Sequence, residues 1–140
     1  MWAASIGLNG WLTSGTFGFT PMHQMGHVLS AQYGATHGAT LACMMPAWMR
    51  HFAGRDDNAK YVQLAERLFG CDLRTAADKY EELMKGFGVQ TRISEFGVRE
   101  EDIERLTDMV VSVSFGPDGK LAGNPQMERE DIRELYKLAL

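Results

Sequence analysis

The segment Thr20–Met49, TPMHQMGHVLSAQYGATHGATLACMMPAWM, holds three of the four histidines of this 140-residue chain and contains no Asp, Glu, Lys or Arg. Thr20 is a suitable N-cap for a helix that has proline at its first position and stops at Gly34. Thr36 is a suitable N-cap for a second helix that ends at Gly54. The short YGATHG reversal between them folds the second helix back on the first. The segment therefore predicts an uncharged helical hairpin.

Charged residues are distributed unevenly along the whole chain. Residues 1–49 carry no Asp, Glu, Lys or Arg, whereas residues 50–140 carry all 14 Lys and Arg and all 18 Asp and Glu. A small domain needs charged surface on most of its helices. The uncharged third of the chain is therefore expected to be buried in the centre of the fold or covered by another part of the protein.

Helical periodicity continues through most of the chain. Apolar residues recur three and four positions apart, and acidic residues lie near the start of each later helix. Alternating strand patterns are nearly absent, and the size and 45% hydrophobic content suit one domain. The fold class predicted is all-α, a bundle of about seven helices in a single domain, residues 1–140. The expected helices are 2–15, 21–33, 36–54, 56–70, 73–88, 99–112 and 128–140, with loops at 90–98 and 116–125, the latter turning at Asp118-Gly119.

Composition excludes several classes of partner. The net charge of −4 and a pI near 5.5 are unsuited to a phosphate backbone, so no nucleic-acid partner is expected. The amino terminus has no basic segment, and no apolar run reaches the ~18 residues that span a bilayer, so neither an export signal nor membrane association is expected. Cys43 and Cys71 form no CxxC motif. Two isolated cysteines favour buried thiols in a cytoplasmic protein.

The three clustered histidines are the main candidate for chemistry. His23 and His27 are four residues apart and project from one face of the first helix, beside an apolar stripe. His37 opens the second helix, so the hairpin is expected to bring all three imidazoles into one groove. They are either hydrogen-bonded core side chains or metal ligands. Metal binding is the leading functional interpretation.

Two hydrolytic alternatives fit the residues poorly. The spacing of HQMGH copies the metallopeptidase motif H-E-x-x-H, but Gln24 replaces the general base, and an amide cannot take a proton from metal-bound water. Ser30 and Cys43 lack a nucleophile elbow and a nearby carboxylate.

His51 is expected to be a solvent-side or helix-end residue.

The pattern H-x3-H-x9-HG, formed by His23, His27 and His37 and followed by LA…MPAWMRH, resembles the carboxy-terminal half of the iron-containing (group III) alcohol dehydrogenases. The butanol dehydrogenase-like branch is the most similar. GLNGWLTSG, GVQTRISEFGV and EREDIRELYKLAL also resemble segments of that family, so the resemblance covers essentially the whole chain. It implies a dehydroquinate synthase-like helical domain in which one divalent metal, iron or zinc, is held by one Asp and three His.

By this resemblance His23 and His37 match the last two metal ligands. His27 matches a histidine beside the metal, near the nicotinamide of NAD or NADP and the substrate, with a role in proton relay or positioning. The implied activity is reduction of a small aldehyde or oxidation of a small alcohol. The family places its Asp and first His on a D-x-x-x-H helix, a motif that does not occur in these 140 residues.

The chain is therefore expected to be the helical metal-binding part of a dehydrogenase, without its dinucleotide-binding domain and inactive by itself. The uncharged residues would then form one wall of an active site, supplied by residues such as Met22, Met25, Phe17 and Phe19 unless these belong to the core. An exposed apolar wall tends to pair with another copy, so a homo-oligomer is expected. The alternatives are a free-standing helical interaction module and a small metal-sensing or metal-storage protein, neither of them catalytic.

Overall fold

The computed structural model describes residues 1–9, 11, 21–56, 58–123 and 125–140. Within these ranges it is all-helical, and the only β contacts are isolated antiparallel bridges of Leu121 with Phe115 and Met127. The fold class predicted from the sequence is thereby confirmed. The elements are α1 (Trp2–Leu8), α2 (Pro21–Tyr33), α3 (His37–Phe52), α4 (Ala59–Phe69), α5 (Leu73–Gly86), η1 (Ile93–Phe96), η2 (Glu100–Asp102), α6 (Ile103–Ser114) and α7 (Arg129–Ala139).

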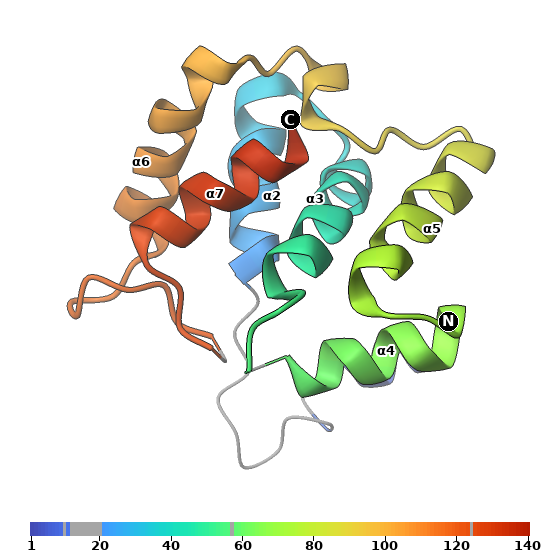
Figure 1. Cartoon of the computed structure of the whole chain (residues 1–140). Helices are drawn as coiled ribbons and strands as arrows, with labels where there is room; N and C mark the ends of the chain where they lie inside the picture. The colour runs from blue at the N-terminus through green and yellow to red at the C-terminus, as the bar shows by residue number, and fades with distance from the viewer. Residues whose placement is uncertain (10, 12–20, 57, 124) are drawn as a thin grey trace.

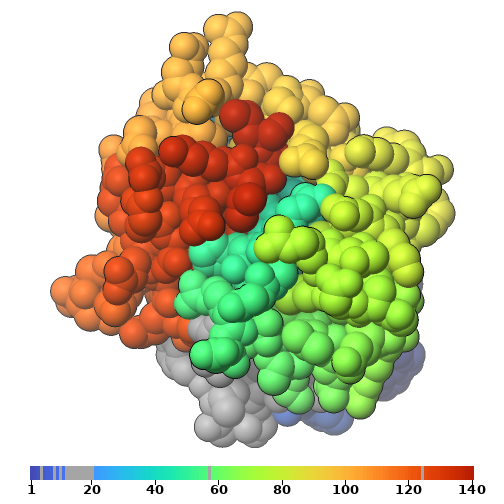
Figure 2. All heavy atoms as spheres, viewed as in Figure 1, coloured from blue at the N-terminus to red at the C-terminus, as the bar shows by residue number. Residues whose placement is uncertain are grey.

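Helix α3 is the centre of the bundle. It packs against α2, α5 and α7, while α6 lies against α2 and α7, and α4 lies against α5 (Figure 1). In the surface view the carboxy-terminal end of α3 is visible between α7 and the α4–α5 pair (Figure 2). Both helices of the predicted hairpin therefore form the inside of the fold.

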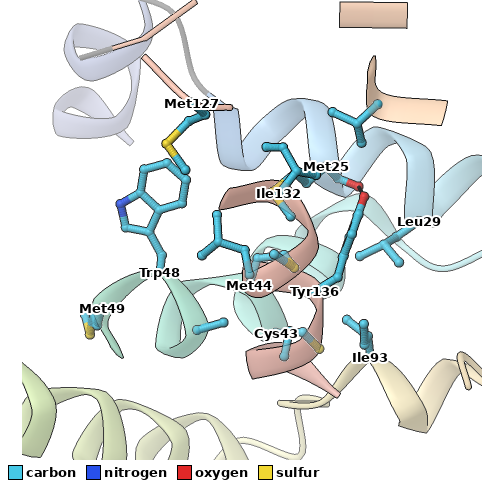
Figure 3. Close-up of a cluster of buried hydrophobic side chains, with 14 of the residues drawn as sticks. Met25, Leu29, Cys43, Met44, Trp48, Met49, Ile93, Met127, Ile132 and Tyr136 are labelled. Carbon is cyan, nitrogen blue, oxygen red and sulfur yellow. Dashed lines mark hydrogen bonds between the residues drawn. The ribbon is translucent and has the colours of Figure 1, made fainter. Parts of the chain in front are cut away.

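Apolar residues of α2 and α3 make this arrangement favourable. Met25 and Leu29 of α2 and Cys43 and Met44 of α3 are completely buried, and they meet Tyr136 of α7 in one cluster (Figure 3). Burying a side chain of this size stabilises a fold by about 1.5–3 kcal/mol. The Tyr136 hydroxyl donates to the Met25 carbonyl oxygen over 3.0 Å, which satisfies this polar group inside the cluster.

The uncharged third of the chain is only partly buried. Residues of α2 and α3 supply much of the core, as expected, but the described side chains of α1 are largely exposed, and Trp2 keeps 81% of its accessible surface. Burial in the centre of the fold is therefore confirmed for α2 and α3 and not for α1, because the absence of charge does not by itself place a helix inside. Coverage of α1 by another part of the protein stays a prediction.

Several element boundaries differ from the sequence prediction, among them the start of α4 at Ala59 instead of residue 56. The first helix ends at Leu8 and not at Gly15, because the Asn9 side chain accepts a bond from the Trp11 amide and closes a local turn instead. Residues 12–20, including the predicted cap Thr20, lie outside the described residues. The predicted loop 90–98 contains the short helix η1.

The sixth helix begins later than predicted. The Asp102 carboxylate accepts a bond from the Arg99 amide, which closes the turn of η2 before α6 starts at Ile103. The predicted turn at Asp118-Gly119 is confirmed. Gly119 has a positive φ of 73°, and the Asp118 side chain accepts a bond from the Lys120 amide.

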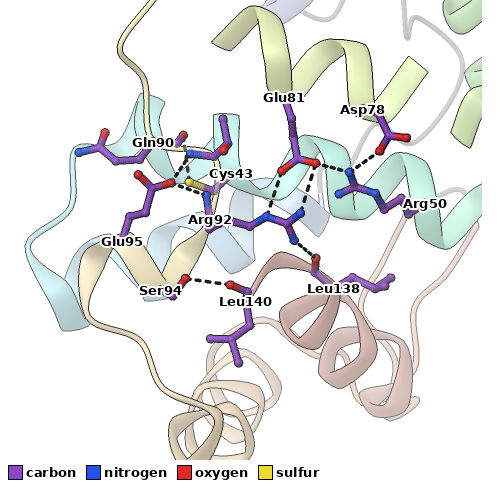
Figure 4. A network of polar contacts seen from close by, with 11 residues as sticks. Cys43, Arg50, Asp78, Glu81, Gln90, Arg92, Ser94, Glu95, Leu138 and Leu140 are labelled. Carbon is purple, nitrogen blue, oxygen red and sulfur yellow. Dashed lines mark hydrogen bonds and ion pairs between the residues drawn. The ribbon is translucent and has the colours of Figure 1, made fainter. Parts of the chain in front are cut away.

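A buried ionic network joins α3, α5 and the end of α7 (Figure 4). The Glu81 carboxylate in α5 pairs with Arg50 in α3 and with Arg92, whose Nε lies 3.0 Å from Glu81 Oε1. Arg92 also donates to the Leu138 carbonyl oxygen of α7. The network therefore fixes the carboxy-terminal half of α3 between its two neighbours.

Among the described residues, no helix has the length and apolar character needed to cross a membrane.

Candidate functional site

The hairpin of α2 and α3 positions the three clustered histidines. His23 and His27 lie one turn apart on α2, and His37 is the first residue of α3. Gly34 ends α2 with a φ of 64°, a conformation that costs glycine little, and its amide donates to the Ser30 carbonyl oxygen. Only three residues separate the helices, so His37 lies next to the face of α2 that carries the other two.

The three imidazoles converge, as the sequence predicts. Ring centroids are 5.0 Å apart for His23 and His37, 4.4 Å for His27 and His37, and 6.0 Å for His23 and His27. His27 is exposed, whereas the other two are half-buried. The cluster therefore has one side open to solvent and one side packed on the bundle.

The relative orientation of the three imidazole rings distinguishes a stacked pair from the third ring. The rings of His27 and His37 are stacked, with an interplanar angle of 4°, whereas the His23 ring is inclined by 63° to that of His37. Imidazole nitrogens bind a metal through lone pairs that lie in the ring plane. Two stacked rings direct these lone pairs along parallel planes, so His27 and His37 cannot bind one ion in this arrangement. The His23 ring is also inclined by 61° to that of His27, but its centroid lies nearer to that of His37, so the inclined pair His23 and His37 is the better candidate to share an ion.

The spacing of the inclined pair suits a metal ion. Two imidazoles on one tetrahedral ion, with metal–nitrogen bonds of about 2.0–2.1 Å, place their ring centroids about 5 Å apart. The His37 Nδ1 atom is buried and has no hydrogen-bond partner. Among the described residues no three His, Cys, Asp or Glu side chains are grouped so that they hold one metal. The donors present therefore fit two ligands of a larger set.

The environment also favours the neutral form of His37. Partial burial lowers the pKa of His37 from its usual value, and the neighbouring His27 and His23 lower it further. A neutral imidazole is the form that binds a metal. The ring is thus in a state suited to ligation near neutral pH.

Gln24 does not share the imidazole cluster. Its side-chain oxygen accepts a bond from Ser114 Oγ of α6 over 3.2 Å. Position 24 therefore faces α6, and a base placed there would not lie beside the histidines as the H-E-x-x-H chemistry requires. The structure adds a geometric argument against a peptidase.

An apolar pocket of about 280 Å³ adjoins His23. Its walls come from α2, α3 and α4 and include Met22, Met45, Trp48 and Tyr61. Met25, considered together with Met22 as a possible wall, is instead completely buried in the core. Phe17 and Phe19, considered for the same role, lie outside the described residues.

His51 lies far along α3 from the other histidines, in its last turn as expected, but its side chain is only 3% exposed. It packs beneath α7, with Nε2 3.4 Å from Asp131 and Nδ1 3.4 Å from Glu134. The solvent-side alternative is therefore wrong, because α7 covers this part of α3.

Cys43 is buried, as predicted, and its thiol donates to the Gln90 carbonyl oxygen.

Sequence reasoning missed two residues that bring the helices together. Gly26 lies in α2 between His23 and His27, and the buried hydroxyl of Thr40 in α3 lies 3.3 Å from its carbonyl oxygen. A glycine within a helical pattern costs about 1 kcal/mol relative to alanine and commonly has a packing reason. Gly26 is therefore the feature of the sequence from which this close contact between the helices could have been predicted.

Comparisons with known proteins identify the family of this chain. The model of the Fe-containing alcohol dehydrogenase family, C-terminal, matches residues 6–140. NADH-dependent butanol dehydrogenase A of Clostridium acetobutylicum is 30% identical over 145 residues, which cover 98% of this chain and 36% of that protein. The NADPH-dependent aldehyde reductase YqhD of Escherichia coli is 34% identical over 115 residues, which cover 76% of this chain and 29% of that protein.

A solved structure from the same family has the same fold. NADH-dependent butanol dehydrogenase A of Thermotoga maritima superposes with a TM-score of 0.81 at 34% identity, over 99% of this chain and 37% of that one. The chain thus spans about a third of the length of these relatives. It belongs to the iron-containing alcohol dehydrogenase family and corresponds to the carboxy-terminal, helical part of its members.

Proposed function

We propose that residues 1–140 are the helical, metal-binding half of a metal-dependent, NAD(P)-linked alcohol dehydrogenase or aldehyde reductase. The observation that carries the proposal is the arrangement of the rings of His23 and His37, 5.0 Å apart and inclined, with His27 stacked beside them. The family match supplies the reaction class, because relatives are butanol dehydrogenases and an aldehyde reductase.

In this proposal His23 and His37 hold the metal, iron or zinc, together with an Asp and a His from a helix upstream of these 140 residues. Imidazole nitrogen is a normal ligand for both ions. The bound metal would supply Lewis acidity to the substrate oxygen, and NAD or NADP would exchange the hydride. His23 and His37 orient the site because they extend from two helices that are packed on the core.

His27 has a different role, as the catalytic residue that lies beside the nicotinamide and the substrate. Its ring is exposed, so the substrate and cofactor can approach it, and it cannot ligate the same ion as His37 while the two rings are stacked. We assign to a ring nitrogen of His27 the transfer of the substrate hydroxyl proton. The apolar pocket beside His23 excludes water and suits the carbon chain of a small alcohol or aldehyde.

A free-standing interaction or metal-sensing module is the alternative. The family match over residues 6–140 favours the dehydrogenase, because it includes all three histidines.

We further propose that the enzyme is a homo-oligomer, since large exposed side chains such as Trp2 and Phe87 would be covered by association.

The test compares two proteins, the product of the complete gene and the isolated 140 residues. The gene product, loaded with iron or zinc, should oxidise NADH or NADPH in the presence of butanal. The isolated chain should do neither this nor retain one metal through dialysis against a mild chelator. Two imidazoles are fewer than the three protein ligands typical of a catalytic site, and a proximity contribution of about 7–11 kcal/mol is lost when no nicotinamide is held in place.

Three outcomes would contradict the proposal. The first is a gene product without NAD(P)H-linked activity on any small aldehyde. The second is one tightly held metal per isolated chain. The third is turnover by the isolated chain that His23→Ala abolishes.

A further inference from the structure

The two histidine-bearing helices approach each other closely at Gly26, where α2 has no side chain. A Cβ atom added at Gly26 would lie 3.0 Å from Thr40 Oγ1, 3.1 Å from Leu41 Cδ2 and 3.5 Å from His37 Cε1. The first two distances are shorter than ordinary van der Waals contact. The first turn of α3 therefore rests directly on the backbone of α2, at the turn that lies between His23 and His27.

The hydroxyl group of Thr40 is held at this contact. Thr40 is completely buried, and its Oγ1 lies 2.8 Å from the His37 carbonyl oxygen and 3.3 Å from the Gly26 carbonyl oxygen. Both oxygens are acceptors, so the single hydroxyl proton is directed to one of them or shared between them. The group links the turn that carries His37 to the turn that carries the other two histidines.

We propose that Gly26 and Thr40 are positioning residues that set the distance between the imidazoles of His23 and His37. The inference rests on the proposed metal site, in which these two rings share one ion. Ligand distances at a metal are held to within about 0.2 Å, so a shift of α3 by a few tenths of an ångström would move His37 out of range. Neither residue contacts the ion, and each acts through the helix that bears His37.

The experiment measures zinc affinity in the product of the complete gene, by competition with a chromogenic chelator, together with the thermal midpoint of each variant. Thr40→Val preserves the shape of the side chain and removes the hydroxyl. Thr40→Ser retains the hydroxyl and serves as the rescue. Thr107→Val is the matched control, because Thr107 is also completely buried and its hydroxyl bonds the Ile103 carbonyl oxygen over 2.8 Å within α6.

Thr40→Val should weaken zinc binding by about 10–100-fold, the usual loss when a group that supports a ligand is removed. Thr40→Ser should bind zinc as the wild type does. Thr107→Val should lose comparable thermal stability and bind zinc unchanged. Gly26→Ala should weaken zinc binding in the same direction as Thr40→Val, since its methyl group displaces the first turn of α3.

Equal zinc affinity in Thr40→Val and the wild type would overturn the inference. So would an equal loss of affinity in Thr40→Val and Thr107→Val, because the effect would then follow stability alone. His23→Ala separates this failure from failure of the proposed function. If His23→Ala binds zinc normally, the metal site itself is wrong. If only His23→Ala loses zinc, the site stands and the positioning role is refuted.

Discussion

Replacing Glu81 by glutamine should destabilise the protein far more than the same change at its neighbour Glu82. The Glu81 side chain is 7% exposed and pairs with Arg50 and Arg92 (Figure 4). Glu82 is exposed. Glu81→Gln preserves size, removes the negative charge and turns an amide donor toward guanidinium groups. Two cations would then remain near one another without their shared counter-ion.

The expected loss of stability in Glu81→Gln depends on how exposed its two arginine partners are. Breaking a fully buried ion pair costs about 3–5 kcal/mol. Arg50 and Arg92 are 17% and 39% exposed, so water would solvate part of each, and Arg50 keeps its second contact with Asp78 over 2.7 Å. We expect a loss of about 2–3 kcal/mol, because partial exposure reduces the penalty.

Urea denaturation of the folded protein, followed by circular dichroism, measures this loss as a change in the midpoint at constant slope. Glu82→Gln should change stability by less than about 0.5 kcal/mol, as is usual for a surface substitution. If Glu81→Gln and Glu82→Gln are equally stable, the network does not hold α3 between α5 and α7 and the reasoning is refuted.

Two further predictions concern the cysteines and association. Burial raises the pKa of Cys43 to about 12, so at pH 8 iodoacetamide should modify the half-buried Cys71 and leave Cys43 intact until urea is added; early modification of Cys43 would contradict its burial. The pKa of an ordinary cysteine thiol is 9.0, so the stabilisation from the neutral Cys43 thiol is complete below pH 9 and declines between pH 9 and about 12. Urea titrations at both pH values would show this decline. The isolated chain should be a dimer or larger by light scattering, since Trp2, Trp11 and Phe87 are 81%, 75% and 71% exposed, and a monomer at high concentration would contradict this.

The helical fold could be predicted because local signals agree with one another. Glycines end α2 and α4, Asp72 caps α5 with bonds to two amides, and apolar periodicity covers each helix. The hairpin that brings the histidines together followed from the same signals, since only three residues separate α2 from α3. Element boundaries failed where side chains close turns on the backbone, as Asn9 and Asp102 do.

Long-range packing could not be predicted. Nothing near His51 in the sequence indicates that α7, about 80 residues later, covers its side chain, nor that Arg50 and Arg92 share Glu81. The metal roles of His23 and His37 and the catalytic role of His27 came from family resemblance. Ring stacking excludes His27 and His37 from one ion, and the shorter centroid distance favours His37 over His27 as the partner of His23. Those roles remain predictions.

Metal content across a series of three histidine variants tests this separation most directly. His23→Ala, His37→Ala and His27→Ala would each be introduced into the product of the complete gene and analysed for iron and zinc after dialysis against a mild chelator. The account predicts that His23→Ala and His37→Ala lose the metal, whereas His27→Ala retains it and loses turnover with butanal. Retention of metal by His23→Ala, or loss from His27→Ala as complete as from the other two, would contradict it.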